Sequence, residues 1–175
     1  IVRMDADTTA GKGGHERVLA SFEAMPGAVL LGTQMVAKGL DYPDVTLVGV
    51  LNADTTLHFP DFRAAEHTYQ LLAQVAGRAG RSSKPGAVVI QTYWPAHPAI
   101  QAVATHEPER FYTRERVERE QLGYPPYGRL ANLIVTGEDR EEVVRVASQL
   151  ADSARSTLPE PEARVLGPSP APLAR

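Results

Sequence analysis

The sequence predicts an α/β fold, in which a mostly parallel sheet is flanked by helices, followed by a small, truncated α+β unit. Short apolar runs occur at 28–31, 45–51 and 87–90, and Gly or Pro residues lie at their borders. Runs without polar alternation are typical of strands covered on both faces, as in a parallel sheet. Helical patterns lie between these runs, and this alternation favours a right-handed, parallel arrangement.

The elements of the first part follow from these patterns in chain order. Residues 1–4 (IVRM) are predicted to form a strand. A helix is predicted at 14–25, because apolar residues recur there at spacings of one and two turns, and a longer periodic helix is predicted at 63–79. Two further helices are predicted to begin near residues 98 and 109, the second of them strongly charged.

A breaker, YPPY at 124–127, closes this helical region and begins the second part. Beyond it we predict a strand at 129–136 and an amphipathic helix at 139–157, and another strand is expected to start at 164–166. The predicted division of the chain is a main α/β unit at 1–105, a helical connector at 106–128 and the start of an α+β domain at 129–175.

The composition excludes several classes of protein. A net charge of only -3 argues against a protein that coats nucleic acid with a basic surface, so any DNA contact is expected to be local. The absence of cysteine removes disulfides, thiolate metal sites and cysteine nucleophiles. His97 and His106 have no partner at metal-ligand spacing, so no metal site is predicted.

The hydropathy of the chain bears on its membrane association, and its two ends bear on whether it is part of a longer protein. No apolar run approaches the roughly 18 residues of a membrane helix, so we expect a soluble, non-secreted protein without a membrane partner. The chain opens inside an apolar run without an initiator Met and stops inside a proline-rich stretch. We therefore expect it to be a segment of a longer protein.

The helix predicted at 63–79 carries two faces near its end. One stripe is apolar and is expected to pack against the sheet. It consists of Leu72, Val75, Ala76 and Ala79. The second stripe has the same spacing, is displaced by two residues and is expected to face outward. It consists of Gln74, Gly77, Arg78 and Arg81. Glycine weakens a helix by about 1 kcal/mol relative to alanine, so the helix is expected to end near Gly77 and Gly80.

Arg78 and Arg81 indicate a site for an anion. Arginine offers forked donors and stays charged at working pH, so two guanidiniums beside an amide suit a multiply charged oxyanion such as a nucleoside triphosphate. In the alternative interpretation, both arginines cap the helix end or form surface salt bridges. The sequence has no GxxxxGK[ST] loop and no Asp-Glu pair after an apolar strand. The phosphate cradle and metal site are therefore expected elsewhere.

The loop after the apolar run at 28–31 is a second candidate. Thr33 and Gln34 can donate hydrogen bonds to phosphate oxygens, Lys38 adds a positive charge and Gly39 permits close backbone approach. Ligands of parallel α/β folds bind at this edge of the sheet. The structural alternative is a loop in which Thr33 and Gln34 satisfy local backbone groups.

A resemblance to known proteins connects these features. The stretch GTQMVAKGLDYPDVTLVGVLNADTTLHFPDFRAAEHTYQLLAQVAGRAGR resembles the second RecA-like lobe of superfamily 2 helicases, with 32–39 similar to motif V and 74–81 similar to motif VI. Seven segments, in order, carry a narrower resemblance: VRMDADTT, TQMVAKG, PDFRAAE, QVAGRAGR, QTYWPAHPAI, LGYPPYGRLA and VLGPSPAPLAR. Together they resemble the PriA family of bacterial replication restart, over essentially the whole chain.

This resemblance implies an ATP-driven DNA helicase of 3′ to 5′ polarity, which recognises stalled or recombination forks and restarts replication by primosome assembly. The implied cofactor is ATP with Mg²⁺, shared with a first lobe absent from the chain, and zinc is implied only in an upstream cysteine-rich segment. The implied partners are fork or single-strand/duplex junction DNA, single-stranded DNA-binding protein and primosome proteins. The implied location is the bacterial cytoplasm, in association with the nucleoid.

The resemblance also implies roles for individual residues. The implied residues are Arg78 and Arg81 for catalysis, Gln74, Gly77 and Gly80 for nucleotide binding, and Thr33, Lys38 and Gly39 for contacts with the DNA backbone. Backbone contacts position a protein without reading base sequence. Tyr93 and Trp94 could stack on a base, but core packing is the expected role of both.

Two other functions stay open at this stage. The protein could be an ATPase-inactive scaffold that binds forks and loads the primosome. It could also be a different superfamily 2 translocase without loading activity, against which the C-terminal resemblance argues. In isolation the segment is expected to be inactive, because it lacks the phosphate loop and the metal-binding carboxylates.

Overall fold

The computed structural model describes residues 1–5, 8–9, 11, 13–33, 44–77, 85–158 and 163–171. The chain divides into two compact units, Ile1–Gln121 and Leu122–Arg175. The elements of the first unit are β1 (Val2–Met4), α1 (Gly14–Glu23), β2 (Leu30–Gly32), β3 (Leu47–Val50), α3 (Asp54–Leu57), α4 (Ala64–Ala76), β4 (Ala87–Ile90), α5 (Pro98–Thr105) and α6 (Pro108–Leu122), the last of which ends at the boundary. The second unit contains α7 (Arg140–Thr157).

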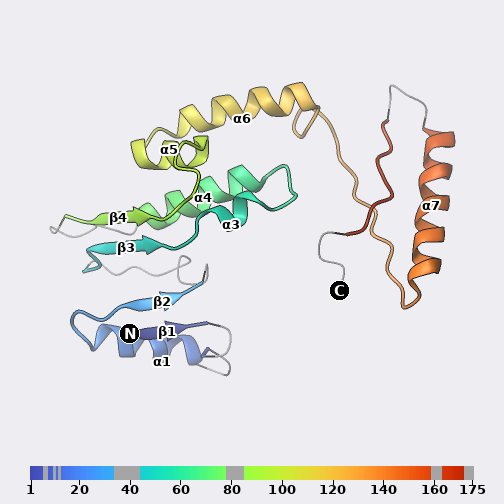
Figure 1. Ribbon diagram of the computed structural model, residues 1–175. Coiled ribbons are helices and arrows are strands. Elements are labelled where there is room, and N and C mark those ends of the chain that lie inside the picture. The colour runs from blue at the N-terminus through green and yellow to red at the C-terminus, as the bar shows by residue number, and fades with distance from the viewer. Residues whose placement is uncertain are drawn as a thin grey trace. The chain divides into compact units, whose positions relative to one another are not determined.

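The strands of the first unit pair in parallel, as the sequence predicts. β1 pairs with β2 in the register Val2 to Leu30, and β3 pairs with β4 in the register Leu47 to Ala87 (Figure 1). α1 connects the first pair, and α3 and α4 lie between the strands of the second pair. Parallel strands need such crossovers, because a short turn can join only antiparallel neighbours. The α/β class is therefore confirmed.

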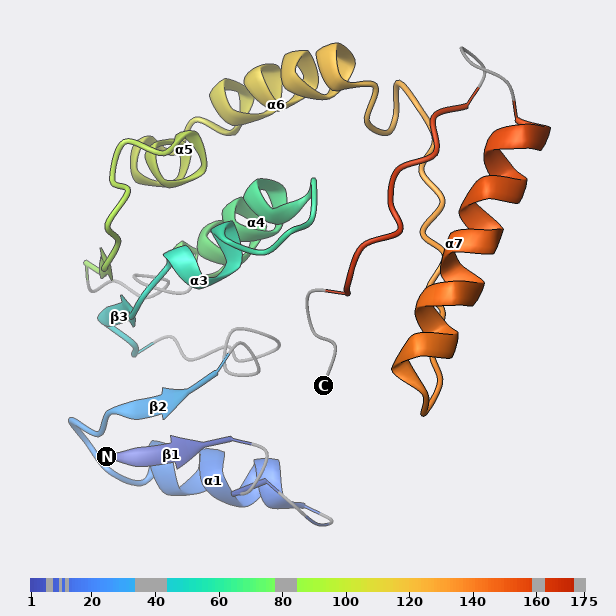
Figure 2. The ribbon, with the colours of Figure 1, turned by 45° about the vertical axis from the view of Figure 1, so that its right-hand side comes forward.

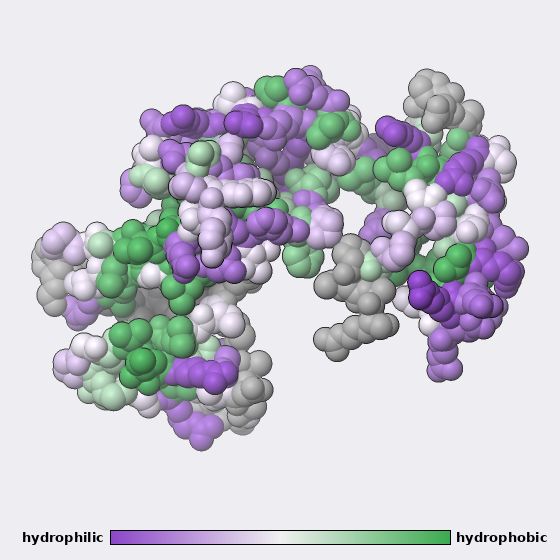
Figure 3. Space-filling model, in the orientation of Figure 1, coloured by the Kyte–Doolittle hydropathy of each residue, from purple (hydrophilic) through white to green (hydrophobic). Residues whose placement is uncertain are grey.

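The β3–β4 sheet is covered on one face only, so the expectation of cover on both faces is wrong for the described part of this chain. Val50 and Ile90 pack against the core. Leu47 and Val89, on the other face, are 62% and 59% exposed. Figure 3 shows hydrophobic residues gathered over the strands. A continuous apolar run indicates that both faces can be buried, but the helices described here supply cover to one of them.

The core of the first unit lies among α4, α5 and α6. Leu72 and Phe111 are each 1% exposed, and the ring of Phe111 stacks on Tyr69 at a centroid distance of 4.8 Å. Such a pair adds about 0.5–1.5 kcal/mol to the burial of its apolar surface. This core fixes α4, whose carboxyl end carries the candidate site.

The helix α5 begins where the sequence predicts, because its first turn is capped. The imidazole of His97 accepts a hydrogen bond from the backbone N–H of Ala99 at 3.2 Å, and Pro98 occupies the first helical position. Proline is favoured there because its fixed φ suits a helix. It also lacks the N–H that would have no intrahelical partner at this position. The helix ends at Thr105, and its C-cap His106 adopts the left-handed conformation with φ 56°.

The second unit contains the predicted helix but neither predicted strand. α7 starts after Asp139, whose carboxylate accepts hydrogen bonds from the N–H groups of Glu141 and Glu142. The residues at 129–136 and 164–166 are extended without forming strands, and they run beside α7 (Figures 1 and 2). A β-strand needs a neighbouring strand to which its backbone can hydrogen-bond. Among the described residues, no segment pairs with either of these two in a β-ladder.

Candidate functional site

The carboxyl end of α4 has the two faces that the sequence predicts, as far as the structure describes it. Leu72 is 1% exposed on the packed face, and Gln74 is exposed on the other. The helix ends at Ala76, and Gly77 caps it with a backbone N–H bond to the carbonyl oxygen of Ala73. Both the orientation of Gln74 and the end of the helix near Gly77 are thus confirmed.

The described part of the chain includes some of the predicted site residues and not others. Arg78, Gly80 and Arg81 lie outside the described residues. In the loop after β2, Thr33 follows the strand directly and is exposed, whereas Lys38 and Gly39 lie outside the described residues. The structure therefore describes Gln74, Gly77 and Thr33 of the predicted set.

Gly77 is not required by the packing of its own helix. Its φ of -68° and ψ of 0° are accessible to any residue. A Cβ added there would lie 3.5 Å from the carbonyl oxygen of Ala73, which is ordinary contact. Alanine favours helices by about 1 kcal/mol over glycine, so the conformation of α4 does not by itself require glycine here. A glycine at a helix end permits the close approach of another group.

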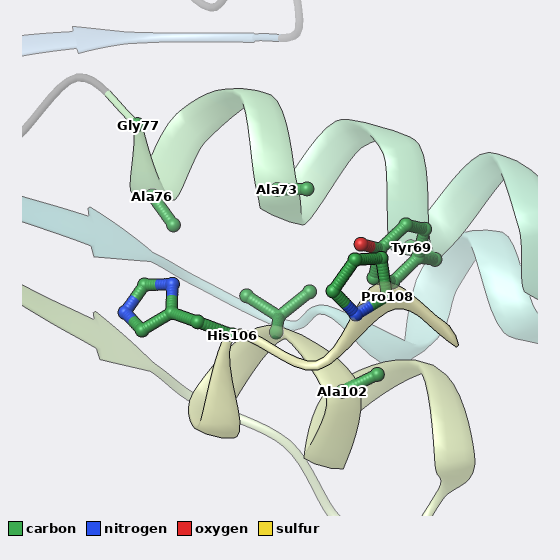
Figure 4. A pocket seen from close by; sticks show the side chains of 8 residues that line it. Tyr69, Ala73, Ala76, Gly77, Ala102, His106 and Pro108 are labelled. Atoms are coloured by element: carbon green, nitrogen blue, oxygen red, sulfur yellow. The ribbon is translucent and has the colours of Figure 1, made fainter. Parts of the chain in front are cut away.

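A cavity of about 190 Å³ lies beside the last turn of α4. It is lined by Tyr69, Ala73, Ala76, Gly77, Ala102, Val103, His106 and Pro108. Figure 4 shows that the lining comes from α4 on one side and from α5 and the residues after it on the other. Burial raises the pKa of Tyr69 above its ordinary value. Because the lining is mainly apolar, the cavity suits an apolar group rather than a phosphate.

Asp54 is a buried carboxylate that the sequence analysis did not select. It follows β3, is 3% exposed and accepts hydrogen bonds from the hydroxyl of Thr92 at 2.5 Å and the N–H of Tyr93 at 2.8 Å. These two bonds, the Thr92 bond foremost, lower the pKa of Asp54 below its ordinary value. The available signal was an acidic residue just after an apolar strand. Asp54 joins the carboxyl ends of β3 and β4.

Tyr93 and Trp94 are exposed, so the expectation that they pack in the core is wrong. Tyr93 is 84% exposed and Trp94 is 50% exposed. The ring of Trp94 contacts His58 at a centroid distance of 4.8 Å and lies nearly parallel to His97 at 6.3 Å. The turn held by Asp54 directs both aromatic side chains away from the core, which residues of α4, α5 and α6 fill.

A cluster of charged side chains, formed by Arg119, Glu115 and Glu66, joins α6 to the start of α4. The guanidinium of Arg119 donates to Glu66 at 2.7 Å and to Glu115 at 2.9 Å, and it lies over the ring of Phe62 at 5.1 Å. Burial opposes its charge, but the bonds to the two carboxylates outweigh burial and raise the pKa of Arg119 above its ordinary value. The cluster fixes the helix that leads to the predicted arginines.

The described residues contain neither a candidate metal site nor a helix that could cross a membrane. No group of three or more His, Cys, Asp or Glu side chains among them could hold a metal ion. No helix in the same part of the chain is both long and apolar enough to cross a membrane.

Comparison with known families supports the architecture described above. A family model for the helicase conserved C-terminal domain matches residues 1–83, and a model for the primosomal protein N C-terminal domain matches residues 120–175. The replication restart protein PriA of Bacillus subtilis is 51% identical over 175 residues, which is 100% of this chain and 22% of that protein. The chain belongs to the PriA family. The helicase-domain match agrees with a RecA-like α/β fold followed by a small C-terminal domain.

Other PriA proteins also match nearly the whole chain while extending well beyond it. The chain is 47% identical to the replication restart protein PriA of Synechocystis over 174 residues, covering 99% of this chain and 21% of that protein. It is 37% identical to the PriA of Haemophilus influenzae over 175 residues, covering 100% of this chain and 24% of that protein. The chain thus spans about a fifth to a quarter of the length of these curated PriA relatives.

Proposed function

We propose that the chain is the second motor lobe of an ATP-dependent DNA helicase of 3′ to 5′ polarity that acts in replication restart. The observation that carries this proposal is the two-faced end of α4, with Leu72 buried and Gln74 exposed, directly before Arg78 and Arg81. The family membership supports it, since both matched models and the named relatives are helicase or replication restart proteins.

In this proposal Arg78 and Arg81 face the triphosphate of ATP, which is held with Mg²⁺ mainly by a lobe outside this chain. A guanidinium that neutralises charge on the transferred phosphoryl group accelerates hydrolysis by about 10³–10⁵ in other NTPases. Gln74, Gly77 and Gly80 belong to the same sequence stretch and are proposed to contact the nucleotide. The exposed amide of Gln74 and the glycine that the helix does not itself need both fit an approaching nucleotide.

The DNA contact in this proposal is local. Thr33, Lys38 and Gly39 contact the phosphate backbone at the carboxyl end of β2, which suits translocation because such contacts do not read sequence. The net charge of -3 agrees with a few positioned contacts rather than a broad basic surface. The DNA substrate is a fork or a single-strand/duplex junction.

The partners and setting follow from the family. We propose that the full protein acts with single-stranded DNA-binding protein and primosome proteins in the bacterial cytoplasm, at the nucleoid. Zinc binding is proposed only for a segment upstream of this chain. Alone, the chain is proposed to be inactive as an ATPase and helicase.

One observation favours a second candidate, a fork-binding and primosome-loading scaffold without ATPase activity. The described residues of α7 contain no buried side chain, and apolar residues of the same unit are exposed, Leu133 to 76% and Leu166 to 74%. A small unit with this much exposed apolar surface is suited to docking. Under this candidate, deletion from residue 125 onward abolishes primosome loading while leaving any ATPase activity intact.

The test is DNA-stimulated ATP hydrolysis by the full-length protein, compared between wild type and Arg81→Ala. We expect hydrolysis to fall by at least about two orders of magnitude, with fork binding unchanged. Arg81→Lys tests the forked geometry, because lysine keeps the charge but not the bidentate donors. Arg145→Ala, an exposed arginine of α7, is the control and should hydrolyse ATP normally. No hydrolysis by wild type would support the scaffold instead.

A further inference from the structure

Exposed aromatic residues follow both β3 and β4 in the chain. Phe59 follows α3 and is 53% exposed, and Tyr93 and Trp94 follow β4 and are 84% and 50% exposed. His58 and His97 both lie near the ring of Trp94, at centroid distances of 4.8 Å and 6.3 Å. Exposure of large apolar side chains to water is unfavourable. Exposed rings that follow the carboxyl ends of parallel strands therefore mark a candidate ligand surface.

The rings are held in place by a fixed turn. The hydroxyl of Thr92 donates to Asp54 and accepts from the N–H of Trp94 at 3.0 Å, while the N–H of Tyr93 donates to the other carboxylate oxygen of Asp54. Farther along, the N–H of His97 donates to the carbonyl oxygen of Trp94 at 2.9 Å. A buried carboxylate thus organises the backbone under two exposed rings.

From this geometry we infer that Trp94 and Tyr93 form a stacking platform for an unpaired nucleobase of single-stranded DNA. The inference rests on the proposed function, in which the chain is a lobe of a motor that handles single-stranded DNA. It adds a contact to bases, which the backbone contacts proposed for Thr33, Lys38 and Gly39 do not supply.

The chemistry of the rings favours a nucleobase as the occupant. Trp94 is braced by two imidazoles, so little conformational freedom is lost when a flat base stacks on it. The indole and phenol also have polar edges that can reach the edge of a base. The negative charge of Asp54 is buried beneath the turn and is satisfied by donors, so it is not presented to a DNA phosphate. Stacking of this kind tolerates any base, as a translocating motor requires.

The inference is tested by the affinity of the full-length protein for two oligonucleotides of equal length, oligo-dT and the same strand made abasic. Both have identical phosphates, but only oligo-dT can stack. We expect Trp94→Ala to weaken oligo-dT binding by about 5- to 150-fold and to leave abasic binding unchanged. Trp94→Phe should retain most of the affinity. Tyr127→Ala, a partly exposed tyrosine of the second unit, is the control.

A direct measurement complements the affinities. A strand carrying 5-iodouracil should crosslink to Trp94 or Tyr93 on irradiation, and mass spectrometry identifies the residue. An equal loss of affinity for both oligonucleotides, or no loss for either, would overturn the inference. So would a variant that binds oligo-dT normally but fails in primosome assembly, since that result indicates a protein interface.

The stacking platform and the motor role of Arg81 can be disproved independently of each other. If Arg81→Ala hydrolyses ATP normally while Trp94→Ala loses affinity for oligo-dT alone, the proposed motor role of motif VI is wrong and the platform stands. If Arg81→Ala abolishes hydrolysis and Trp94→Ala binds both oligonucleotides like wild type, the motor stands and the platform is wrong.

Discussion

Arg119 on α6 donates to Glu66 on α4 at 2.7 Å, across 53 residues of sequence. Their side chains are only 14% and 23% exposed. Glu115, one turn before Arg119 on α6, accepts a second bond from the same guanidinium. The pair ties the connector to the first turn of the helix that ends at Gly77. The orientation of that helix therefore depends on α6 as well as on the sheet.

Replacing Arg119 with Met should destabilise the protein by about 1–3 kcal/mol, because two partly buried carboxylates lose their charged donor. Urea unfolding measures the change. Arg114→Met is the matched control on the same helix, since its ion pair with Glu118 is exposed and should contribute less than about 1 kcal/mol. Equal effects of the two substitutions would contradict the role assigned to Arg119.

Leu72→Ala should cost about 2–5 kcal/mol, the range for removing a large aliphatic side chain from a packed core. Leu72 is 1% exposed and lies on the packed face of α4. Leu133→Ala in the second unit is the control, because Leu133 is 76% exposed and should change stability by less than about 0.5 kcal/mol. Thermal unfolding with calorimetry distinguishes the two. A small effect at Leu72 would mean that α4 is held mainly by its polar contacts.

Much of the first unit could be predicted from sequence because its signals are local. Apolar runs bounded by Gly or Pro fixed the positions of β3 and β4, and helical spacing identified α4 and its two faces. The end of α4 near Gly77 was predictable from the low helix propensity of glycine. These features depend on residues within a few positions of one another.

What sequence did not reveal depends on distant partners. The extended residues at 129–136 have the pattern of a strand, but a strand also needs a neighbour to pair with. The exposure of Trp94 is set by Asp54, which lies 38 residues before Thr92 in the chain. Periodicity carries no information about such pairs, and it cannot tell an aromatic residue that packs from one that a distant carboxylate directs outward.

Gly77→Ala should leave stability unchanged or raise it by up to about 1 kcal/mol, while lowering ATP hydrolysis by the full-length protein. The helix itself accepts a Cβ there, at 3.5 Å from the nearest backbone atom. Loss of activity at undiminished stability would therefore locate an approaching group outside the helix. Thermal unfolding and DNA-stimulated hydrolysis are measured on the same preparation. Normal hydrolysis would remove Gly77 from the nucleotide site.

His97 should make the stability of the protein depend on pH. Burial, together with the positive charge of Arg114, lowers the pKa of His97 below its ordinary value of 6.5. The imidazole nitrogen also accepts the N–H of Ala99 as the helix cap. Its contribution is therefore complete above pH 6.5 and is lost as the pH falls through the lower pKa of the folded state. His97→Asn keeps a capping oxygen that does not titrate.

The measurement for His97 is the melting temperature of both proteins at a series of pH values below 7.5. Wild type should lose stability relative to His97→Asn on acidification, and the difference should level off above pH 6.5. Parallel curves for the two proteins would show that this imidazole does not contribute to the pH dependence.

Asp54→Asn should loosen the turn that presents Tyr93 and Trp94. If the amide oxygen accepts from the N–H of Tyr93, the NH₂ group faces Thr92, whose hydroxyl must then accept from it instead of donating. The two charge-assisted bonds to the carboxylate are also replaced by weaker neutral ones. Amide hydrogen exchange in the peptide 91–97 should accelerate in the variant, and iodouracil crosslinking to Trp94 should fall with it. Asp152→Asn, an exposed residue of α7, should change neither.

Protonation of Asp54 at low pH should also loosen this turn. Because hydrogen bonds from Thr92 and Tyr93 hold the pKa of Asp54 below 3.8, its stabilising contribution is present above pH 3.8 and is lost as the pH falls through the lower folded value. Exchange in peptide 91–97 should therefore rise in wild type below that pH and stay insensitive to acid in Asp54→Asn, after correction for the intrinsic rate. Exchange that rises equally in both proteins would show that the turn is held by contacts other than Asp54.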